Sequence, residues 1–372
     1  MKIPRYNHRA QFTDLPATID QIERALASGD YILGDTVARF EQRFGDYLGA
    51  AYTIGVNTGT DALTLALTAL DIGPGDEVVT VANTFHATVL AITSVGATPV
   101  LVDCEPDTYL MNLDALAAAC GPRTRAILAV HLFGRSLDMD RVTAIATRHQ
   151  IPVVEDCAQA VGARWGGRRV GTFGAAAAFS FHPSKNLAAA GDAGAVVTDN
   201  PEIAHKIRVL RGLGQHGQGN HVALGVNSKL DAIQAIVLDT KLDHLDGWNA
   251  QRQTIAARYA HALTHPAIAV PPPPQDHGDH VYHLYPVAVP RRDAVLARLR
   301  SDGIDAVIRY PVPIHRQPAF TGYRFDGSYP HAERQAADTL CLPNRPDLSP
   351  AEVDFVCERL TTAITDSQEA LP

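Results

Sequence analysis

Short apolar runs alternate with segments of helical periodicity up to about residue 200. The apolar runs are EVVTVA (77–82), TPVLVDC (98–104), RAILAVHLFG (125–134), IPVVEDC (151–157), AAAAFSF (175–181) and GAVVTD (194–199). Between the first of them lie DALTLALTAL (61–70) and ATVLAITSVG (87–96), whose spacing is helical. Continuous apolar strands separated by helices predict an α/β fold with a mostly parallel sheet covered on both faces.

The pattern changes in the remainder of the chain. A polar helix is predicted over PEIAHKIRVLRGLG (201–214), a long helix from about Lys229 to Trp248, and a linker or turn at PPPP (271–274). Beyond it we predict a strand in HVYHLYPVAV, a helix in DAVLARLRSDG and a strand in AVIRYPVP. With 372 residues, the chain exceeds what one hydrophobic core usually serves. We therefore expect a large α/β domain over 1–245 and a smaller α+β domain over 246–372.

Composition narrows the classes of protein. The chain is 46% hydrophobic and 19% charged, as in globular proteins, and its net charge of −8 disfavours nucleic-acid or anionic-membrane partners. The N-terminal MKIPRYNHRAQFTDLP has no apolar core of a signal peptide, and no run approaches a membrane span, so a cytoplasmic protein is expected. The five cysteines are scattered without a CxxC pair, which favours reduced thiols and predicts no metal site.

The sequence GLGQHG (212–217) satisfies the dinucleotide pattern G-x-G-x-x-G. That fingerprint requires a strand before the glycines and a helix after them. Here a charged helix precedes them and polar residues follow, so the segment is interpreted as a glycine-rich helix exit with a mobile loop.

Candidate ligand-binding residues follow the predicted strands, because parallel α/β sheets bind ligands at their carboxyl ends. In NTGTDAL, Gly59 and Thr60 precede a helix and suit a phosphate, although the same residues make an ordinary turn and helix cap. Asp156 ends the strand of VVEDCAQA, where an acid caps the next helix or pairs with a buried cation. Three other residues are candidates for the same crevice, and the histidine among them has a structural role as its alternative: Gln159, Ser180 and His86.

Lys185 is the one lysine of the otherwise small and apolar stretch FHPSKNLAAAGDAGAVV (181–197). A buried lysine is costly unless it is paired or has lost its charge. A lysine, a strand-end acid, a phosphate cradle and an aromatic ring together meet the requirements of pyridoxal 5′-phosphate. This cofactor needs a Schiff-base lysine, an acid at its pyridine nitrogen, a phosphate cup and a ring that stacks on its face.

The chain resembles the DegT/DnrJ/EryC1/StrS family of sugar aminotransferases almost from end to end. The blocks that carry the resemblance are SGDYILGDTVARFEQRFGDYLGA, NTGTDAL, GATPVLVDCEPDTY, VHLFG, VEDCAQAVGARW, FSFHPSKNLAAAGDAGAVV, GVNSKLDAIQAIVL and RYPVPIHRQPAF. The resemblance implies the fold type I, aspartate aminotransferase-like architecture, with a seven-stranded, mostly parallel sheet in the large domain. A dehydrating branch of the family replaces the lysine with histidine, so Lys185 favours transamination.

The resemblance also implies roles for the matching residues. Lys185 would form the Schiff base and move the proton, Asp156 would bind the pyridine nitrogen, and Gln159 the ring hydroxyl. The remaining cofactor contacts would be Gly59, Thr60 and Ser180 at the phosphate, His86 on the ring face, and Asn227 reaching the phosphate from the neighbouring subunit. Toward the substrate would lie Tyr310, His315 and Lys229, the last of which an ordinary surface ion pair explains equally well.

The implied reaction has two halves. L-Glutamate or L-glutamine would leave its amino group on the cofactor as pyridoxamine 5′-phosphate, and a keto group at C-3 or C-4 of a nucleotide-linked, dTDP-type keto-6-deoxyhexose would accept it. The expected assembly is a homodimer with shared active sites, in amino-sugar biosynthesis for an antibiotic or a surface glycan. Two alternatives stay open: a keto-cyclitol substrate, and a regulatory protein that has lost catalysis.

Overall fold

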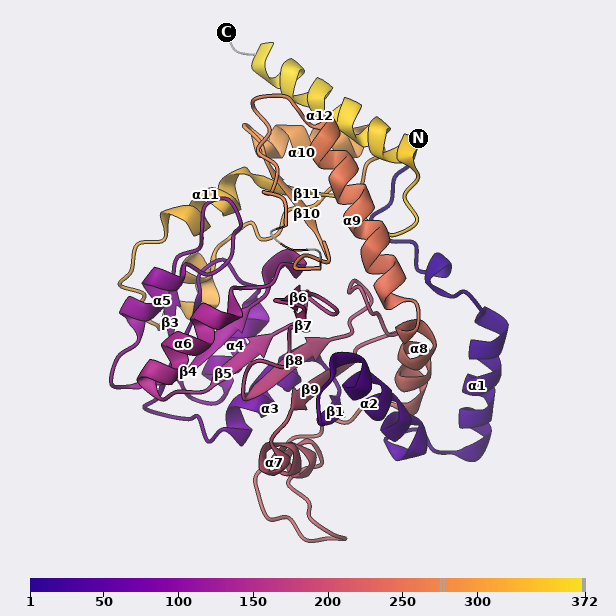
Figure 1. Cartoon of the computed structure of the whole chain (residues 1–372), viewed down its shortest axis with the longest axis vertical. Coiled ribbons are helices and arrows are strands. Elements are labelled where there is room, and N and C mark those ends of the chain that lie inside the picture. Colours follow the sequence, from indigo (N-terminus) through magenta and orange to yellow (C-terminus); the bar gives the residue numbers. More distant parts are fainter. Residues whose placement is uncertain (275, 277, 370–372) are drawn as a thin grey trace.

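A seven-stranded sheet forms the centre of the computed structural model, which describes residues 1–274, 276 and 278–369 (Figure 1). Its spatial order is β1-β9-β8-β5-β4-β2-β3. Only β9 runs antiparallel to its neighbours β1 and β8, so the mostly parallel sheet is confirmed. The strands are β1 (Tyr52–Val56), β2 (Glu77–Val81), β3 (Thr98–Val102), β4 (Thr124–Val130), β5 (Val153–Asp156), β8 (Ala176–Ser180) and β9 (Gly194–Thr198).

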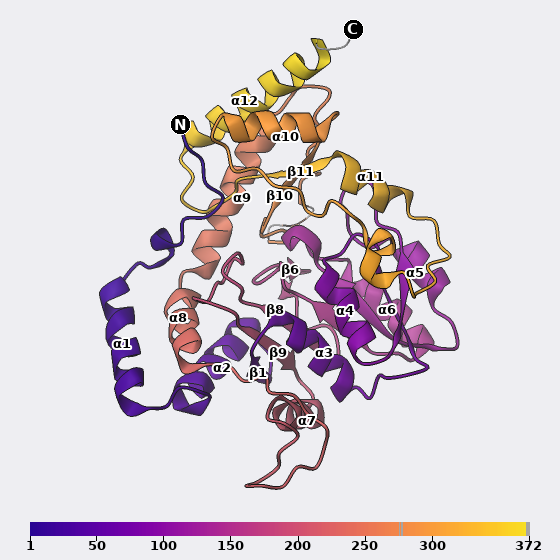
Figure 2. The ribbon, with the colours of Figure 1, turned by 180° about the vertical axis from the view of Figure 1, so that it is seen from behind.

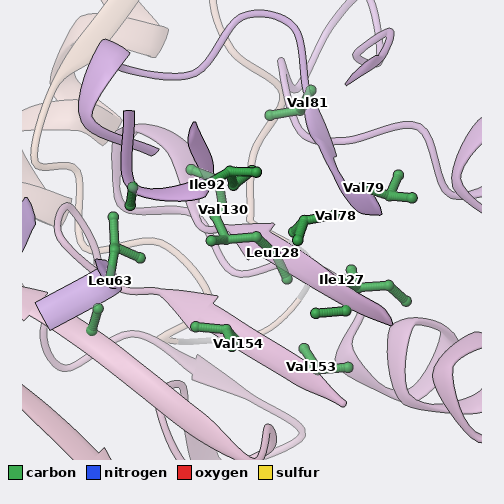
Figure 3. Close-up of a cluster of buried hydrophobic side chains, with 14 of the residues drawn as sticks. Leu63, Val78, Val79, Val81, Ile92, Ile127, Leu128, Val130, Val153 and Val154 are labelled. Carbon is green, nitrogen blue, oxygen red and sulfur yellow. The ribbon is translucent and has the colours of Figure 1, made fainter. Parts of the chain in front are cut away.

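Helices cover both faces of this sheet, because alternate side chains of its strands point to opposite faces. Ala176, Ala178 and Val196 join the apolar cluster that contains the buried residues of α3 and α7, whereas Ala177, Phe179 and Val197 join the cluster of α2 and α8. Figure 3 shows part of the first cluster, around Leu63 and the central strands. The helices are α2 (Gly34–Leu48), α3 (Gly59–Ala69), α4 (His86–Ser94), α5 (Leu113–Ala119), α6 (Met139–His149), α7 (Pro201–Arg211) and α8 (Ala232–Leu242).

A third apolar cluster gathers residues of the C-terminal part, between Ile255 and Ile364, together with Ile3 from the N-terminus. Its elements lie together at one end of the molecule, at the top of Figures 1 and 2. They are α9 (Leu245–Ala262), the antiparallel pair β10 (Tyr285–Ala288) and β11 (Thr339–Leu342), α10 (Arg292–Ser301) and α12 (Pro350–Glu369). The boundary between residues 245 and 246 stays a prediction, although α9 begins there.

The remaining elements are short or peripheral. Helix α1 stands at the outer edge of the molecule in both views, and α11 lies beside the C-terminal part (Figures 1 and 2). No helix in the described part of the chain is long and apolar enough to cross a membrane. These elements are α1 (Leu15–Ser28), α11 (Pro330–Asp338), the hairpin β6 (Arg164–Trp165) and β7 (Arg168–Arg169), and the 3₁₀-helices η1 (Arg9–Gln11), η2 (Leu132–Gly134), η3 (Ile314–Arg316) and η4 (Pro318–Phe320).

Three predictions for the second half of the chain are corrected. The helix expected from Lys229 to Trp248 is two helices, because α8 ends at Leu242 and α9 begins at Leu245. The strand expected over 280–289 is confined to β10, and the one expected over 306–313 is reduced to a single bridge between Val307 and Cys341. The glycine-rich segment 212–217 follows the end of α7 and leads into a loop, as predicted.

Candidate active site

A cavity of about 380 Å³ opens at the carboxyl edge of the sheet. Strands β1, β5 and β8 point to this edge, and it receives the first turn of α3, the end of β5, the end of β8 and the turn that follows β8. Residues from the C-terminal part close the other side. Seven of the predicted site residues line it: Gly59, Thr60, Asp156, Gln159, Ser180, Lys185 and Tyr310.

Asp156, the last residue of β5, is buried in the wall of this cavity. Thr88 Oγ1 donates to its Oδ2 at 2.9 Å, and the Ala158 amide donates to its Oδ1 at 3.1 Å. Burial raises the pKa of Asp156, while these hydrogen bonds and the charge of Lys185 favour its ionised form. A carboxylate held in this way is suited to bind a protonated ring nitrogen.

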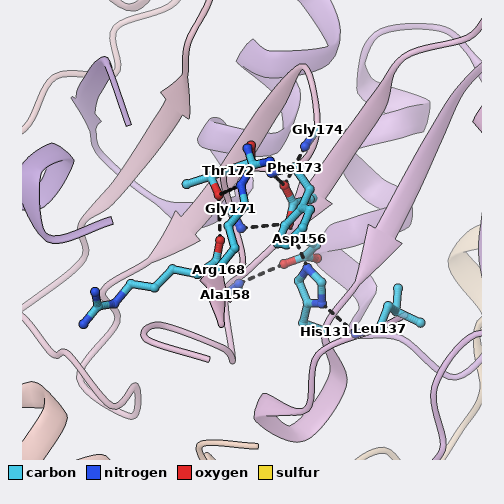
Figure 4. A network of polar contacts seen from close by, with 11 residues as sticks. His131, Leu137, Asp156, Ala158, Arg168, Gly171, Thr172, Phe173 and Gly174 are labelled. Atoms are coloured by element: carbon cyan, nitrogen blue, oxygen red, sulfur yellow. Dashed lines mark hydrogen bonds and ion pairs between the residues drawn. The ribbon is translucent and has the colours of Figure 1, made fainter. Parts of the chain in front are cut away.

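His131 and Glu155 form a buried pair beside Asp156 (Figure 4). The Leu137 amide donates to His131 Nδ1 at 3.1 Å, so the proton of the ring lies on Nε2, which contacts Glu155 Oε2 at 3.1 Å. Burial alone would raise the pKa of Glu155, but hydrogen bonds from His131 and from backbone amides of 171–174 lower it. The His131 amide in turn donates to the Asp156 carbonyl, so this network fixes the end of β5.

Cys157 lies beside this pair, and the ligand atoms of His131, Glu155 and Cys157 are within 4.8 Å of one another. Both nitrogens of His131 and both oxygens of Glu155 are occupied by the hydrogen bonds just described. Burial also raises the pKa of the Cys157 thiol well above its usual value. We interpret the group as a structural hydrogen-bond network.

Lys185 follows β8 and faces the same cavity, half-buried. Burial lowers the pKa of Lys185 to about 8; the nearby carboxylate of Asp156 opposes this shift, and the positive charge of Arg309 adds to it. A substantial fraction of this amine is therefore unprotonated at mildly alkaline pH, which makes it a competent nucleophile and proton carrier.

The first turn of α3 forms a cradle for an anion against the end of β8. Thr58 caps the helix by accepting from the Asp61 amide at 3.0 Å, which leaves the earlier amides of the turn without a partner inside the helix. A Cβ at Gly59 would lie 2.6 Å from the Ser180 Cβ, so only glycine allows this close approach. The free amides, the hydroxyl groups and the positive end of the helix fit a phosphate group.

Gln159 and Tyr310 join the sheet edge to the C-terminal part. The Phe133 amide donates to Gln159 Oε1 at 2.7 Å, which fixes the amide orientation, and Gln159 Nε2 donates to the Tyr310 hydroxyl at 3.0 Å. The Tyr310 ring lies 5.2 Å from the ring of Phe85. A flat ligand in the cavity would therefore meet aromatic rings as well as hydrogen-bonding groups.

The aromatic residue that lines the cavity in this turn is Phe85, and not the predicted His86. His86 begins α4, and its ring stacks on Phe320 at 5.0 Å, outside the residues that line the cavity. The preceding residue, Phe85, lines the cavity instead and is 49% exposed. Because successive residues at this strand-to-helix turn point in different directions, an error of one position exchanges a cavity residue for a packing residue.

Three other predicted residues also lie outside the cavity of this single subunit. His315 Nε2 contacts Glu333 Oε1 at 2.9 Å, and its ring packs against Tyr329. Asn227 is exposed and Lys229 half-buried, in the segment that leads from the loop after α7 toward α8. Their predicted contacts with cofactor and substrate therefore remain predictions.

Sequence reasoning missed several residues that line the cavity. Arg309 and His283 come from the C-terminal part, and Tyr6 comes from the N-terminal segment. His283 Nδ1 lies 3.2 Å from Asn186 Oδ1, and burial lowers the pKa of His283 well below its usual value, so the ring is neutral. None of these residues follows a strand of the large sheet, and so the rule of strand ends could not find them.

The lysine, the buried acid and the phosphate cradle fit pyridoxal phosphate, and with this sheet they define a fold type I enzyme that uses the cofactor. The chain belongs to the DegT/DnrJ/EryC1/StrS aminotransferase family, whose model matches residues 15–361. It is a pyridoxal-phosphate-dependent aminotransferase. Similar solved structures include forms with pyridoxal phosphate and with pyridoxamine phosphate.

Two curated relatives and one solved structure illustrate the similarity. The dTDP-3-amino-3,4,6-trideoxy-α-D-glucose transaminase of Streptomyces venezuelae is 44% identical over 350 residues, which cover 93% of this chain and 92% of the relative. The dTDP-3-amino-3,6-dideoxy-α-D-galactopyranose transaminase of Aneurinibacillus thermoaerophilus is 45% identical over 339 residues, covering 91% and 92%. The crystal structure of S. venezuelae DesV in complex with a ketimine intermediate superposes with a TM-score of 0.93 at 42% identity, covering 100% of both chains.

Proposed function

We propose that this aminotransferase transfers the amino group of L-glutamate, or of L-glutamine, to C-3 of a dTDP-linked keto-6-deoxyhexose. The observation that carries the proposal is the cavity with Lys185 and Asp156 in a chain 44% identical, over 93% of its length, to a transaminase named for a dTDP-3-amino sugar. The choice of C-3 and of dTDP rests on the names of the two curated relatives. The product would serve the biosynthesis of an antibiotic or a surface glycan.

Under this proposal, the cavity residues that would contact the cofactor have the following roles. Pyridoxal phosphate, when bound, withdraws electrons from the carbon that loses or gains a proton. Asp156 holds the proton on the pyridine nitrogen, and Lys185 Nζ removes and returns the proton at the reacting carbon. The amides at the start of α3 and Ser180 bind the phosphate, Gln159 binds the ring hydroxyl, and Phe85 covers the ring face.

The cofactor and donor parts of the proposal are tested by absorption spectroscopy. We expect purified protein with pyridoxal phosphate to show a visible band that L-glutamate converts to the near-ultraviolet band of pyridoxamine phosphate. Lys185→Ala should lose the visible band and reduce turnover by at least about 100-fold, because the proton carrier is removed. Lys206→Ala is the matched control, since that lysine pairs with Asp71 at 2.6 Å on the surface and should leave both signals unchanged.

The acceptor is tested with the pyridoxamine-phosphate form of the enzyme. A dTDP-3-keto-6-deoxyhexose should restore the visible band, and the amine of the product should be located at C-3 by nuclear magnetic resonance. Product aminated at C-4 would overturn the position, and preference for a UDP-linked sugar would overturn the nucleotide. Reaction with a keto-inositol that dTDP does not inhibit would replace the sugar nucleotide with a cyclitol substrate.

The proposal includes a homodimer in which each subunit completes the other's site. The loop after α7 projects away from the sheet (Figure 2) and exposes apolar side chains, with Leu224 100% and Val222 59% exposed. Tyr31 and Ile32, which follow α1, are 50% and 54% exposed. Exposed apolar side chains in these two segments favour burial against a second copy of this chain. Light scattering should give the mass of a dimer.

A further inference from the structure

Arg309 places an unpaired cation in the active-site cavity. Its side chain is half-buried and lines the cavity, and it precedes Tyr310, whose hydroxyl accepts from Gln159. No acceptor for its guanidinium is found among the residues that the structure describes. Two buried arginines contrast with it, because Arg211 pairs with Glu41 at 2.7 Å and Arg345 with Glu352 at 2.6 Å.

A guanidinium that has lost part of its water and found no partner is costly in a protein. Such a group is retained where a ligand supplies the missing anion, and its planar fork matches a carboxylate with two parallel hydrogen bonds. The carboxylates of the cavity do not serve this purpose. Asp156 accepts hydrogen bonds from Thr88 and Ala158. Asp192 also lines the cavity, but it is exposed and forms no ion pair with Arg309 in the described structure.

The position of Arg309 limits which anion of the cofactor or substrates can reach it. Its charge acts on Lys185, His182 and His283, all around the point where the proton is transferred. In an amino acid the α-carboxylate is attached directly to the reacting carbon, so it must lie beside Lys185. In a nucleotide sugar that reacts at C-3, the diphosphate is separated from the reacting carbon by C-2, C-1 and an oxygen, and the cofactor phosphate belongs at the first turn of α3.

We propose that Arg309 binds the α-carboxylate of the amino donor and thereby selects amino acids over simple amines. The inference rests on the proposed donor half-reaction and does not depend on the identity of the sugar. An arginine in this role sets the affinity for the donor, whereas Lys185 and Asp156 carry the chemistry. The enzyme can in this way accept two unlike substrates in one cavity, since only one of them presents a carboxylate at the reacting carbon.

The test compares Arg309→Gln with the parent enzyme in the donor half-reaction, using holoenzyme and L-glutamate without any sugar. Loss of one bidentate contact to a charged group should raise the glutamate concentration needed for half-maximal rate by roughly 10- to 100-fold. Arg309→Lys should fall between the two, because it keeps the charge and loses the fork. Arg125→Gln, at the amino-terminal end of β4 and 64% exposed, is the control and should change nothing.

A second donor identifies which carboxylate is bound. 4-Aminobutyrate keeps the distal carboxylate of glutamate and lacks the α-carboxylate. The preference for L-glutamate over 4-aminobutyrate should therefore fall by roughly 10- to 100-fold in Arg309→Gln. An unchanged preference, with both donors slowed equally, would overturn the assignment in favour of the distal carboxylate or a general electrostatic effect.

The acceptor half-reaction separates this inference from the proposed sugar substrate. With the pyridoxamine form and the keto sugar, Arg309→Gln should stay within about threefold of the parent. A loss as large as that for glutamate would assign Arg309 to the sugar nucleotide and overturn the proposal. If the parent itself ignores every keto sugar, the proposed acceptor fails while the glutamate comparison remains decisive. The visible band of bound cofactor and the thermal midpoint establish that each variant is folded.

Discussion

Single side chains in this site owe their chemistry to burial. Lys185 and Asp156 share one cavity, and burial acts on them in opposite directions, lowering the pKa of the lysine and raising that of the acid. Each shift disfavours the charged form, and their mutual attraction restores part of it. The lysine is therefore reactive at mildly alkaline pH, while the acid keeps hydrogen-bond donors that favour its carboxylate form.

The pKa of Lys185, about 8, predicts how fast cofactor-free protein captures pyridoxal phosphate. Only the neutral amine attacks the aldehyde, and a lowered pKa makes this form abundant above pH 8 rather than above about 10.4, the value of an ordinary lysine. The capture rate should rise through half its maximum near pH 8 and level off above it. Stopped-flow growth of the visible band over a pH series measures this.

The carboxylate of Asp156 provides a control for the pH dependence of cofactor capture. Asp156 raises the pKa of Lys185, so Asp156→Asn should move the midpoint of the capture rate to lower pH. A parent profile that still climbs above pH 10 would contradict the burial argument, as would a midpoint that moves upward in Asp156→Asn.

The sequence identifies the residues that follow strands of the large sheet, because strand ends converge on one edge. Gly59, Asp156, Ser180 and Lys185 all line the cavity for this reason. It does not determine which of two adjacent residues in a turn faces the cavity, and so the prediction named His86 where the structure places Phe85. Arg309 was missed because its place depends on how the C-terminal part packs against the sheet, which no local pattern records.

At the level of elements, the first turn of α3 must lie against the end of β8. There is no room for a side chain at Gly59, because a methyl group there would lie 2.6 Å from the Ser180 Cβ and 3.1 Å from its Cα. Gly59→Ala should push the helix start away from Ser180 and weaken cofactor binding by roughly 10-fold or more, because the phosphate loses aligned amides. Equilibrium dialysis of pyridoxal phosphate measures this.

A matched glycine separates this effect from helix propensity. Gly247 lies in the first turns of α9, and a Cβ there meets nothing within 4 Å. Gly247→Ala should therefore leave cofactor affinity unchanged and slightly stabilise the protein. Equal cofactor affinity in the Gly59→Ala variant and the parent would show that the cradle tolerates a methyl group, against the close-packing argument.

The break between α8 and α9 shows what the apolar pattern leaves out. The segment from Lys229 to Trp248 continues one helical periodicity, yet the helices part at Asp243 and His244. Both residues form tertiary contacts: Arg43 pairs with Asp243 at 2.5 Å, and Thr13 is hydrogen-bonded to His244 at 2.8 Å. Predicting this break requires α2 and the N-terminal segment to be in place. The strands of the large sheet were easier to predict, because each corresponds to a short apolar run that is visible in the local sequence.

At the scale of the whole molecule, one subunit leaves its own site without the contact predicted for Asn227. This residue is exposed, outside the cavity, and bridged to Gly212 at the base of the projecting loop. The same loop exposes Leu224 completely. A residue that is predicted at the cofactor phosphate, but lies outside the cavity of its own subunit, is explained if it acts in the neighbouring one.

Mixed dimers test this arrangement. Lys185→Ala should inactivate a subunit's own site, and Asn227→Ala should weaken cofactor binding in its neighbour's site by roughly 10-fold. A mixed dimer of the two variants, purified through two different affinity tags, would contain one site with both native residues. At limiting pyridoxal phosphate it should therefore recover about half of the parent activity, whereas Lys185→Ala alone is inactive and Asn227→Ala alone keeps roughly a tenth. If Asn227 serves its own subunit, neither site of the mixed dimer is intact, and its activity stays at the level of the separate variants.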